Sequence, residues 1–113
     1  MIHIRKEQME VLEAVMLDLF IKKMLVHVYE LFPEETKDKD KQEMRDLVEE
    51  GINRASGYEI TEEREVALFI DLMVGMGRDF EKQRSNNWIL RILTKEDLKQ
   101  REKMDLIYRR LEG

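Results

Sequence analysis

The sequence contains no cysteine, a single proline and only five glycines among its 113 residues. Without cysteine the chain can form no disulfide, thiolate metal site or cysteine nucleophile, and a reducing compartment is favoured. Few residues interrupt helices, while hydrophobic residues make up 42% and charged residues 40%, which excludes a disordered chain. These numbers predict an all-α fold with a single helical domain over residues 1–113.

Long hydrophobic runs are also missing. The longest, residues 66–76, is interrupted by Asp71 and is far shorter than the roughly 20 residues of a transmembrane helix. Charged side chains are scattered through residues 1–20, so we expect no signal peptide. The predicted location is therefore the cytoplasm, with no membrane contact.

Recognisable catalytic motifs are absent from the sequence. The two histidines, His3 and His27, lie 24 residues apart, and there is no His-Glu-x-x-His motif or glycine-rich phosphate loop. Neither serine lies in a nucleophile motif. We therefore expect no enzyme activity, no catalytic or cofactor-binding residue, no cofactor and no metal.

The first long segment, residues 6–32, has apolar residues at every third or fourth position and ends at Pro33. It carries two apolar stripes. One contains Met9, Leu12, Met16, Phe20, Met24, His27 and Leu31, and the other contains Val11, Val15, Ile21, Leu25, Val28 and Phe32. Because a helix with one neighbour needs only one stripe, we expect it to be central in the bundle or to form half of a homodimer seam.

Capping signals divide the rest of the chain. After a charged loop over residues 33–41, Asp40 and Glu43 indicate a capping box that begins a second helix. Gly57 is expected to end that helix in the left-handed conformation. Thr61 is expected to cap a third helix, which Gly75 or Gly77 would close.

Two further segments complete the predicted fold. Residues 78–87 indicate a loop, and the apolar residues 88–93 are brief, although their neighbours favour a helix. Thr94 and Asp97 predict a capping box before the last helix. The expected architecture is a compact bundle of four main helices and one short helix, with a long central N-terminal helix.

Two titratable residues interrupt apolar patterns. His27 lies on the first stripe, where a histidine satisfied by one hydrogen bond is more common than a catalytic or metal-binding one. Asp71 is expected to point outward between Arg64 and Arg78, each seven positions away. The alternative is a buried carboxylate bonded to His27 or to an arginine.

Charge is unevenly distributed along the chain. The net charge is -5, which argues against a general nucleic-acid binder. Residues 33–60 contain nine acidic and five basic residues, and five of the acids gather on one side: Glu34, Glu35, Glu43, Asp46 and Glu50. They form either an ordinary solvated face or a docking surface for a basic partner. The sequence also contains a methionine cluster, which forms either an adaptable binding surface or part of the core, and core packing is favoured: Met9, Met16, Met24, Met73 and Met76.

Three stretches together resemble a known family: IRKEQM near the start, GINRASGYEITEEREVALFIDLMVGMGRDF in the middle and WILRIL before the last helix. They resemble small bacterial proteins encoded beside type VI secretion spike, adaptor and toxin genes. The resemblance implies a protein-binding module, acting as effector immunity protein, chaperone or adaptor, with a secreted effector or its loading machinery as partner. It assigns no binding residues.

Two other functions remain open. A small helical regulator or nucleic-acid-binding domain would use the basic residues of the last segment, Lys95, Lys99, Arg101, Lys103, Arg109 and Arg110. An enzyme built on His27 and Asp71 is the least favoured, and it would require both residues to line one accessible pocket.

Overall fold

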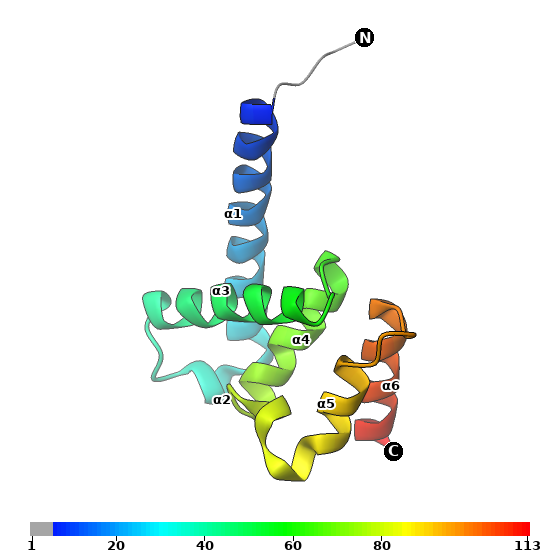
Figure 1. Ribbon diagram of the computed structural model, residues 1–113. Coiled ribbons are helices and arrows are strands. Elements are labelled where there is room, and N and C mark those ends of the chain that lie inside the picture. The colour runs from blue at the N-terminus through cyan, green and yellow to red at the C-terminus, as the bar shows by residue number, and fades with distance from the viewer. Residues whose placement is uncertain (1–5) are drawn as a thin grey trace.

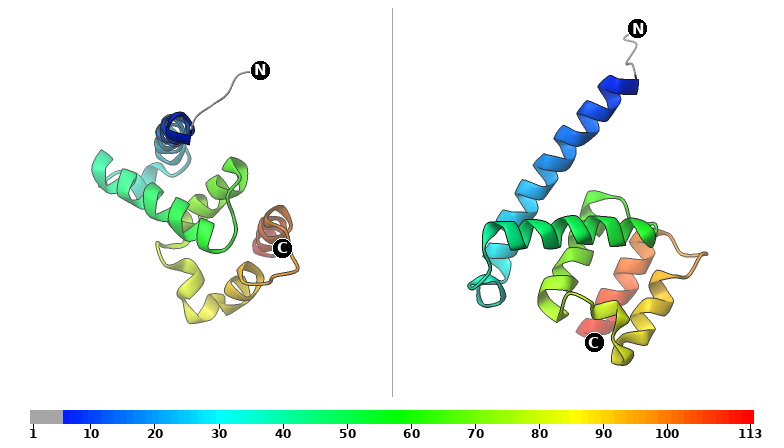
Figure 2. Two further views of the ribbon diagram at one scale, coloured as in Figure 1. Left: turned by 45° about the horizontal axis from the view of Figure 1, so that its top comes forward. Right: turned by 60° about the vertical axis from the view of Figure 1, so that its left-hand side comes forward.

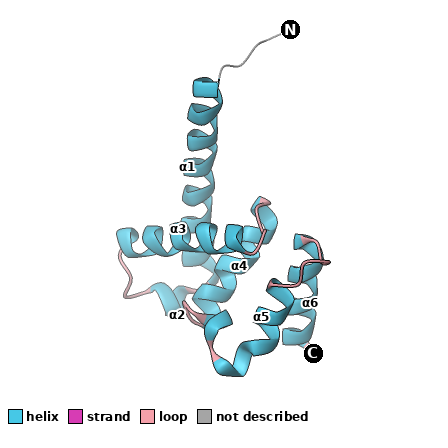
Figure 3. Ribbon diagram, viewed as in Figure 1, coloured by secondary structure: helices cyan, strands magenta, loops and turns pink. Residues whose placement is uncertain are grey.

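The computed structural model describes residues 6–113, with side chains from Val15 onward, and these residues form helices and no strand (Figures 1 and 3). The predicted all-α class is therefore confirmed. The α-helices are α1 (Lys6–Leu31), α2 (Pro33–Thr36), α3 (Lys41–Gly57), α4 (Glu63–Met76), α5 (Asn87–Leu93) and α6 (Gln100–Glu112). Two 3-10 turns, η1 (Phe80–Lys82) and η2 (Arg84–Asn86), connect α4 to α5.

The C-terminal half of α1 packs against α3 and α4, whereas its N-terminal half projects beyond the rest of the molecule (Figures 1 and 2). Ile21, Leu25 and Val28 of the second predicted stripe are buried, but Val15 is 52% exposed. The side chains of Met9, Val11 and Leu12 lie outside the described residues. Only the C-terminal half of α1 thus packs into the bundle, because α3 runs across α1 rather than along it, and the expectation that the N-terminal helix is the central one is wrong.

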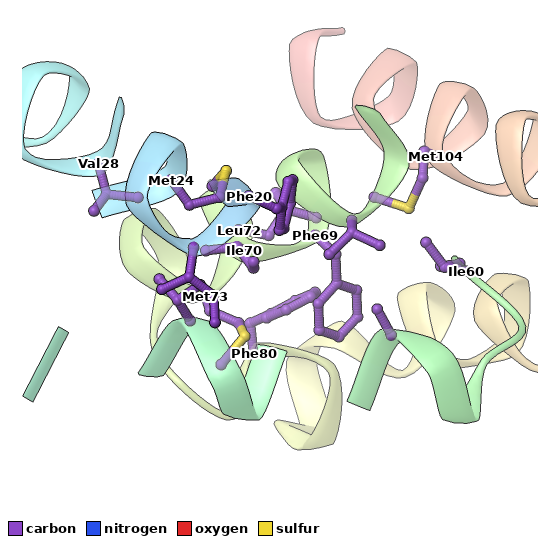
Figure 4. Packing of buried hydrophobic residues seen from close by; sticks show 14 of the residues in the cluster. Phe20, Met24, Val28, Ile60, Phe69, Ile70, Leu72, Met73, Phe80 and Met104 are labelled. Atoms are coloured by element: carbon purple, nitrogen blue, oxygen red, sulfur yellow. The ribbon is translucent and has the colours of Figure 1, made fainter. Parts of the chain in front are cut away.

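The centre of the bundle is α4, which contacts α1, α3 and α6. Its fully buried Phe69 packs edge-on against Phe80 of η1, with 5.2 Å between ring centroids (Figure 4). Such an arrangement adds about 1 kcal/mol beyond the apolar area that the rings bury. Ile70 and Met73 extend the same core toward α3, so α4 rather than α1 holds the bundle together.

The beginning of α3 follows the predicted capping box, and its end does not follow the prediction. The Asp40 carboxylate accepts a hydrogen bond from the Glu43 amide at 2.8 Å, which satisfies a helix-end donor. The predicted loop before it contains the one-turn helix α2. The predicted left-handed Gly57 is wrong: Glu59 adopts the positive φ of 63°, and Gly57 is still helical.

The predicted caps at Thr61 and Thr94 are also wrong. α4 begins at Glu63, and the Gln100 side-chain oxygen accepts the amides of Thr61 and Glu62 at 2.8 and 2.9 Å. Thr94 instead donates its hydroxyl to the Leu90 carbonyl at the end of α5, and α6 begins only at Gln100. A side chain from α6 therefore does what a local cap was expected to do.

The other predicted boundaries agree with the structure. Gly77 closes α4 with a φ of 122°, which a residue with a Cβ adopts only under strain. The short apolar segment is helical, as α5. The segment predicted as a loop over residues 78–87 consists largely of the two 3-10 turns.

Candidate functional site

The five predicted acidic residues lie on α2 and the first three turns of α3, at the end of the molecule remote from α6 (Figure 1). Glu34, Glu35, Glu43 and Asp46 are exposed and Glu50 is partly exposed. We call these five residues the acidic surface. Helical spacing places the three members on α3 along one side, because they lie three and four positions apart.

Neighbouring side chains neutralise part of this charge. Glu34 pairs with Lys37 at 3.4 Å, Glu50 pairs with Arg78 at 2.5 Å, and Gln42 donates to Asp46 at 2.9 Å. Among the described residues, no cation lies within ion-pair distance of the Glu35, Glu43 or Asp46 carboxylate, and the Gln42 amide that donates to Asp46 is uncharged. The negative charge of these three carboxylates is therefore not neutralised by an ion pair within the described fold.

A cavity of about 220 Å³ opens beside Glu35 and Glu43, between α3 and the end of α4. Its lining includes four apolar side chains, Met44, Leu47, Met73 and Val74, and four charged ones, Glu35, Lys39, Glu43 and Arg78. A cavity of about 150 Å³ accommodates benzene, so this one has room for a large side chain. Sequence reasoning missed it because its walls come from helices whose packing no local pattern specifies.

His27 and Asp71 form a direct contact between α1 and α4. The His27 Nε2 atom lies 2.8 and 3.0 Å from the two Asp71 oxygens. The Asp71 side chain is only 13% exposed, and that of His27 is 42% exposed. The expectation that Asp71 points outward between Arg64 and Arg78 is therefore wrong.

The arginines are engaged elsewhere. Arg64 pairs with Glu65 and lies 3.9 Å from Asp105, and Arg78 pairs with Glu50. Seven positions along a helix are about 10.5 Å, whereas α1 crosses α4 at the level of Asp71. Tertiary packing thus brings His27 closer to the Asp71 carboxylate than either arginine.

Burial raises the pKa of the Asp71 carboxyl, and the hydrogen bond with His27 partly opposes this rise. Close by, the Tyr108 hydroxyl on α6 donates to the Leu68 carbonyl on α4 at 2.6 Å. Burial and the negative charge of Asp71 raise the pKa of Tyr108 far above its usual value. These contacts connect three helices, and neither His27 nor Asp71 lines the cavity beside Glu35 and Glu43.

A second buried polar contact, which the sequence analysis did not predict, connects α3 to η1. Arg54 donates to the fully buried Glu81 and, at 2.6 Å, to the Arg78 carbonyl. Its guanidinium carbon lies 5.8 Å from the centre of the Phe69 ring, a cation-π distance. Because a buried charge is costly unless it is paired, this contact fixes the turn after α4.

The methionine cluster divides between core and surface. Met24 and Met73 are buried, Met76 is partly buried, Met16 is 65% exposed, and the Met9 side chain lies outside the described residues. Core packing therefore accounts for the two buried members. No group of three or more His, Asp or Glu side chains suited to a metal occurs among the residues described.

Two basic residues of the last segment make contacts within the fold. Lys103 is 3% exposed and donates to the Tyr58 carbonyl at 2.9 Å. Arg110 stacks over the Trp88 ring, 4.6 Å from its centre. Two of the six bases expected to contact nucleic acid are thus engaged within the fold.

Comparison with known proteins finds no matching protein family, no matching curated protein and no matching solved structure. Within the described residues, no helix combines the length and apolar character that spanning a bilayer requires.

Proposed function

We propose that this protein is a non-catalytic protein-binding module whose acidic surface docks a basic segment of another protein. The cavity beside Glu35 and Glu43 is the observation that carries the proposal. Lysine and arginine bury an apolar stem while keeping a charged head near water. The stem of such a residue would lie against Met44 and Leu47, and its charge would lie beside Glu35 and Glu43, the two members of the acidic surface that line the cavity.

The proposal extends to the cellular system and location. The three sequence stretches that resemble proteins encoded beside type VI secretion genes support a role as effector immunity protein, chaperone or adaptor in the cytoplasm. The partner would be a secreted effector or a component that loads it. Such a partner meets this module either before secretion or as a toxin delivered into the cytosol.

Co-purification from the producing bacterium tests this function. We compare the wild-type protein with Glu35→Lys/Glu43→Lys and with the matched control Glu96→Lys/Glu112→Lys, which makes the same charge change at exposed positions outside the acidic surface. The wild type and the control should recover an effector, spike or adaptor protein. Glu35→Lys/Glu43→Lys should recover much less of this partner, because the reversed charge slows its association by about tenfold.

Circular dichroism should show that all variants remain folded, since exposed charges contribute little to stability. Equal recovery by all three proteins, or recovery of no effector, spike or adaptor by the wild type, would contradict the proposal. The alternative function, a helical regulator or nucleic-acid-binding domain, predicts a gel shift at low salt and micromolar protein.

A further inference from the structure

The outer side of α1 carries an unpartnered apolar surface. Eight large hydrophobic side chains are exposed in the described part of the chain, and six of them belong to α1: Val15, Met16, Leu17, Leu19, Val26 and Leu31. Val15, Leu19 and Val26 lie four and seven positions apart, so at 100° per residue they fall within about 40° of one another. We call these three residues the outer stripe.

The outer stripe lies opposite the face of α1 that enters the core. Ile21, Met24 and Val28, all nearly fully buried, lie on the side of α1 that packs against α3 and α4. The N-terminal half of α1 extends past every other helix (Figure 2). An isolated helix of about 12–15 residues is marginally stable in water, so this half requires support that the described fold does not supply.

We propose that the outer stripe pairs with the same stripe of a second copy, in a parallel two-helix coiled coil along α1. In the sequence, Leu12, Val15, Leu19, Lys22 and Val26 follow one another at alternating spacings of three and four. This is the seam pattern of a coiled coil. The proposal is independent of the acidic surface and concerns a different face of the protein.

Charges beside the outer stripe argue for a second copy in parallel orientation. Asp18 precedes Leu19 and Lys23 follows Lys22, which places them at the two flanking positions of the seam. Within its own chain the Asp18 carboxylate pairs with Lys22 at 3.0 Å and with Arg45 of α3 at 3.2 Å, and it remains 42% exposed. In a parallel pair in register, Asp18 of each copy also faces Lys23 of the other, so its carboxylate is shared with a third cation at two symmetric places. An antiparallel pair sets like flanking positions against each other and loses both.

Lys22 is the one charged residue in the seam. It already pairs with Asp18 of its own helix at 3.0 Å, and its long side chain can reach the edge of the seam. A single polar residue within the seam lowers the stability of a coiled coil, so Lys22 predicts a pair that is weaker than one with an apolar residue at this position.

Light scattering tests the association. The wild-type protein should have twice the chain mass of 13.7 kDa, and Leu19→Glu should have the single-chain mass at the same concentration. Leu19 is 52% exposed, so the core beneath should remain intact, which circular dichroism verifies. A wild-type protein that stays at the single-chain mass at submillimolar concentration would overturn the proposal.

The absence of native cysteine makes the orientation directly testable. In a parallel pair the two copies of position 26 face each other, within the range of Cα separations that a disulfide spans. Val26→Cys should therefore oxidise to a covalent dimer, whereas Ser56→Cys, exposed on α3, should not. Equal cross-linking of both variants would contradict the parallel pair.

A charge reversal tests the predicted ion pairs. Lys23→Asp sets two aspartates against each other twice and should weaken the dimer by about tenfold. Lys82→Asp, the same charge change at an exposed position of η1, should leave the dimer intact. If the two variants dissociate equally readily, Lys23 does not face Asp18 and the proposed register is wrong.

Discussion

The carboxylate of Asp71 is mostly withdrawn from water, with His27 as its hydrogen-bond partner. We predict that His27→Ala lowers the free energy of unfolding by about 1–3 kcal/mol, because it leaves a largely buried acceptor without its donor. Adding Asp71→Asn should recover part of this loss, since a neutral amide is less costly to bury. Urea unfolding at pH 7 measures both effects. A double variant less stable than His27→Ala would show that the carboxylate has another favourable partner.

Tyr108 gives a prediction for alkaline pH. Its pKa in the folded protein is raised above the ordinary value of 10.0, so the folded state holds the proton more tightly than the unfolded state does. Its contribution to stability is complete below pH 10 and is lost as the pH rises above 10. Tyr108→Phe should therefore lose stability less steeply with pH above 10 than the wild type does.

The same substitution removes the hydrogen bond to the Leu68 carbonyl and should cost about 1 kcal/mol at neutral pH. Burial also raises the pKa of Tyr58, so some alkaline destabilisation should remain in the variant. Denaturant unfolding at several pH values between 8 and about 11 measures the difference from the wild type. Identical slopes in the two proteins would contradict the role assigned to Tyr108.

For single residues, the sequence identified Asp71 as unusual but did not show which way its side chain points. Its apolar neighbours indicated either an outward carboxylate or a buried one with a partner, and only the crossing of α1 over α4 decides between them. Arg54 and Glu81 gave no comparable signal, because each lies in a segment with many other charges. The choice of partner depends on tertiary packing, which no local pattern contains.

Contacts between helices distinguish two glycines of α3. A Cβ at Gly51 would lie 2.6 Å from the Ile70 side chain and 3.0 Å from the Met73 sulfur, whereas a Cβ at Gly57 meets nothing within 4 Å. Gly51→Ala should lower stability by about 1–3 kcal/mol through overpacking, despite the higher helix propensity of alanine. Gly57→Ala should raise it by about 0.5 kcal/mol.

Thermal unfolding of the two alanine variants tests both statements at once. Stabilisation by Gly51→Ala would show that α3 and α4 are not in the close contact described. Destabilisation by Gly57→Ala would favour the left-handed conformation that the sequence suggested at Gly57, and would contradict the helical one found in the structure.

For whole elements, sequence prediction worked where the signal is local. Apolar periodicity placed the helices, and the Asp40 cap lies three residues from the amide it satisfies. It failed at Thr94, whose hydroxyl bonds back to the Leu90 carbonyl at the end of α5. It also failed at Thr61, where Gln100 of α6 binds the amides before α4 from 38 and 39 residues away. The residues before α4 therefore contain no local signal for a cap that comes from a side chain so distant in sequence.

For the molecule as a whole, composition predicted the all-α class, and periodicity showed that α1 has more apolar surface than one neighbour can cover. Neither could tell which stripe the core would bury or that α4 would be the central helix. The cavity beside Glu35 and Glu43 was beyond sequence reasoning for the same reason, since α3 and α4 form it together. The charges of the acidic surface were predictable from the sequence, and the apolar side chains that line the cavity beside them were not.

The most direct test of the acidic surface is a titration of the isotope-labelled protein with a short peptide rich in lysine and arginine, followed by the amide signals in nuclear magnetic resonance. The signals of Met44, Leu47, Val74 and Gly77, which line the cavity, should shift at 0.1 M salt. They should shift much less at 1 M, where the screening length falls from about 10 Å to about 3 Å. Glu35→Lys/Glu43→Lys should abolish the shifts and Glu96→Lys/Glu112→Lys should retain them. Unmoved cavity signals in the wild type, or equal shifts in both double variants, would contradict the account.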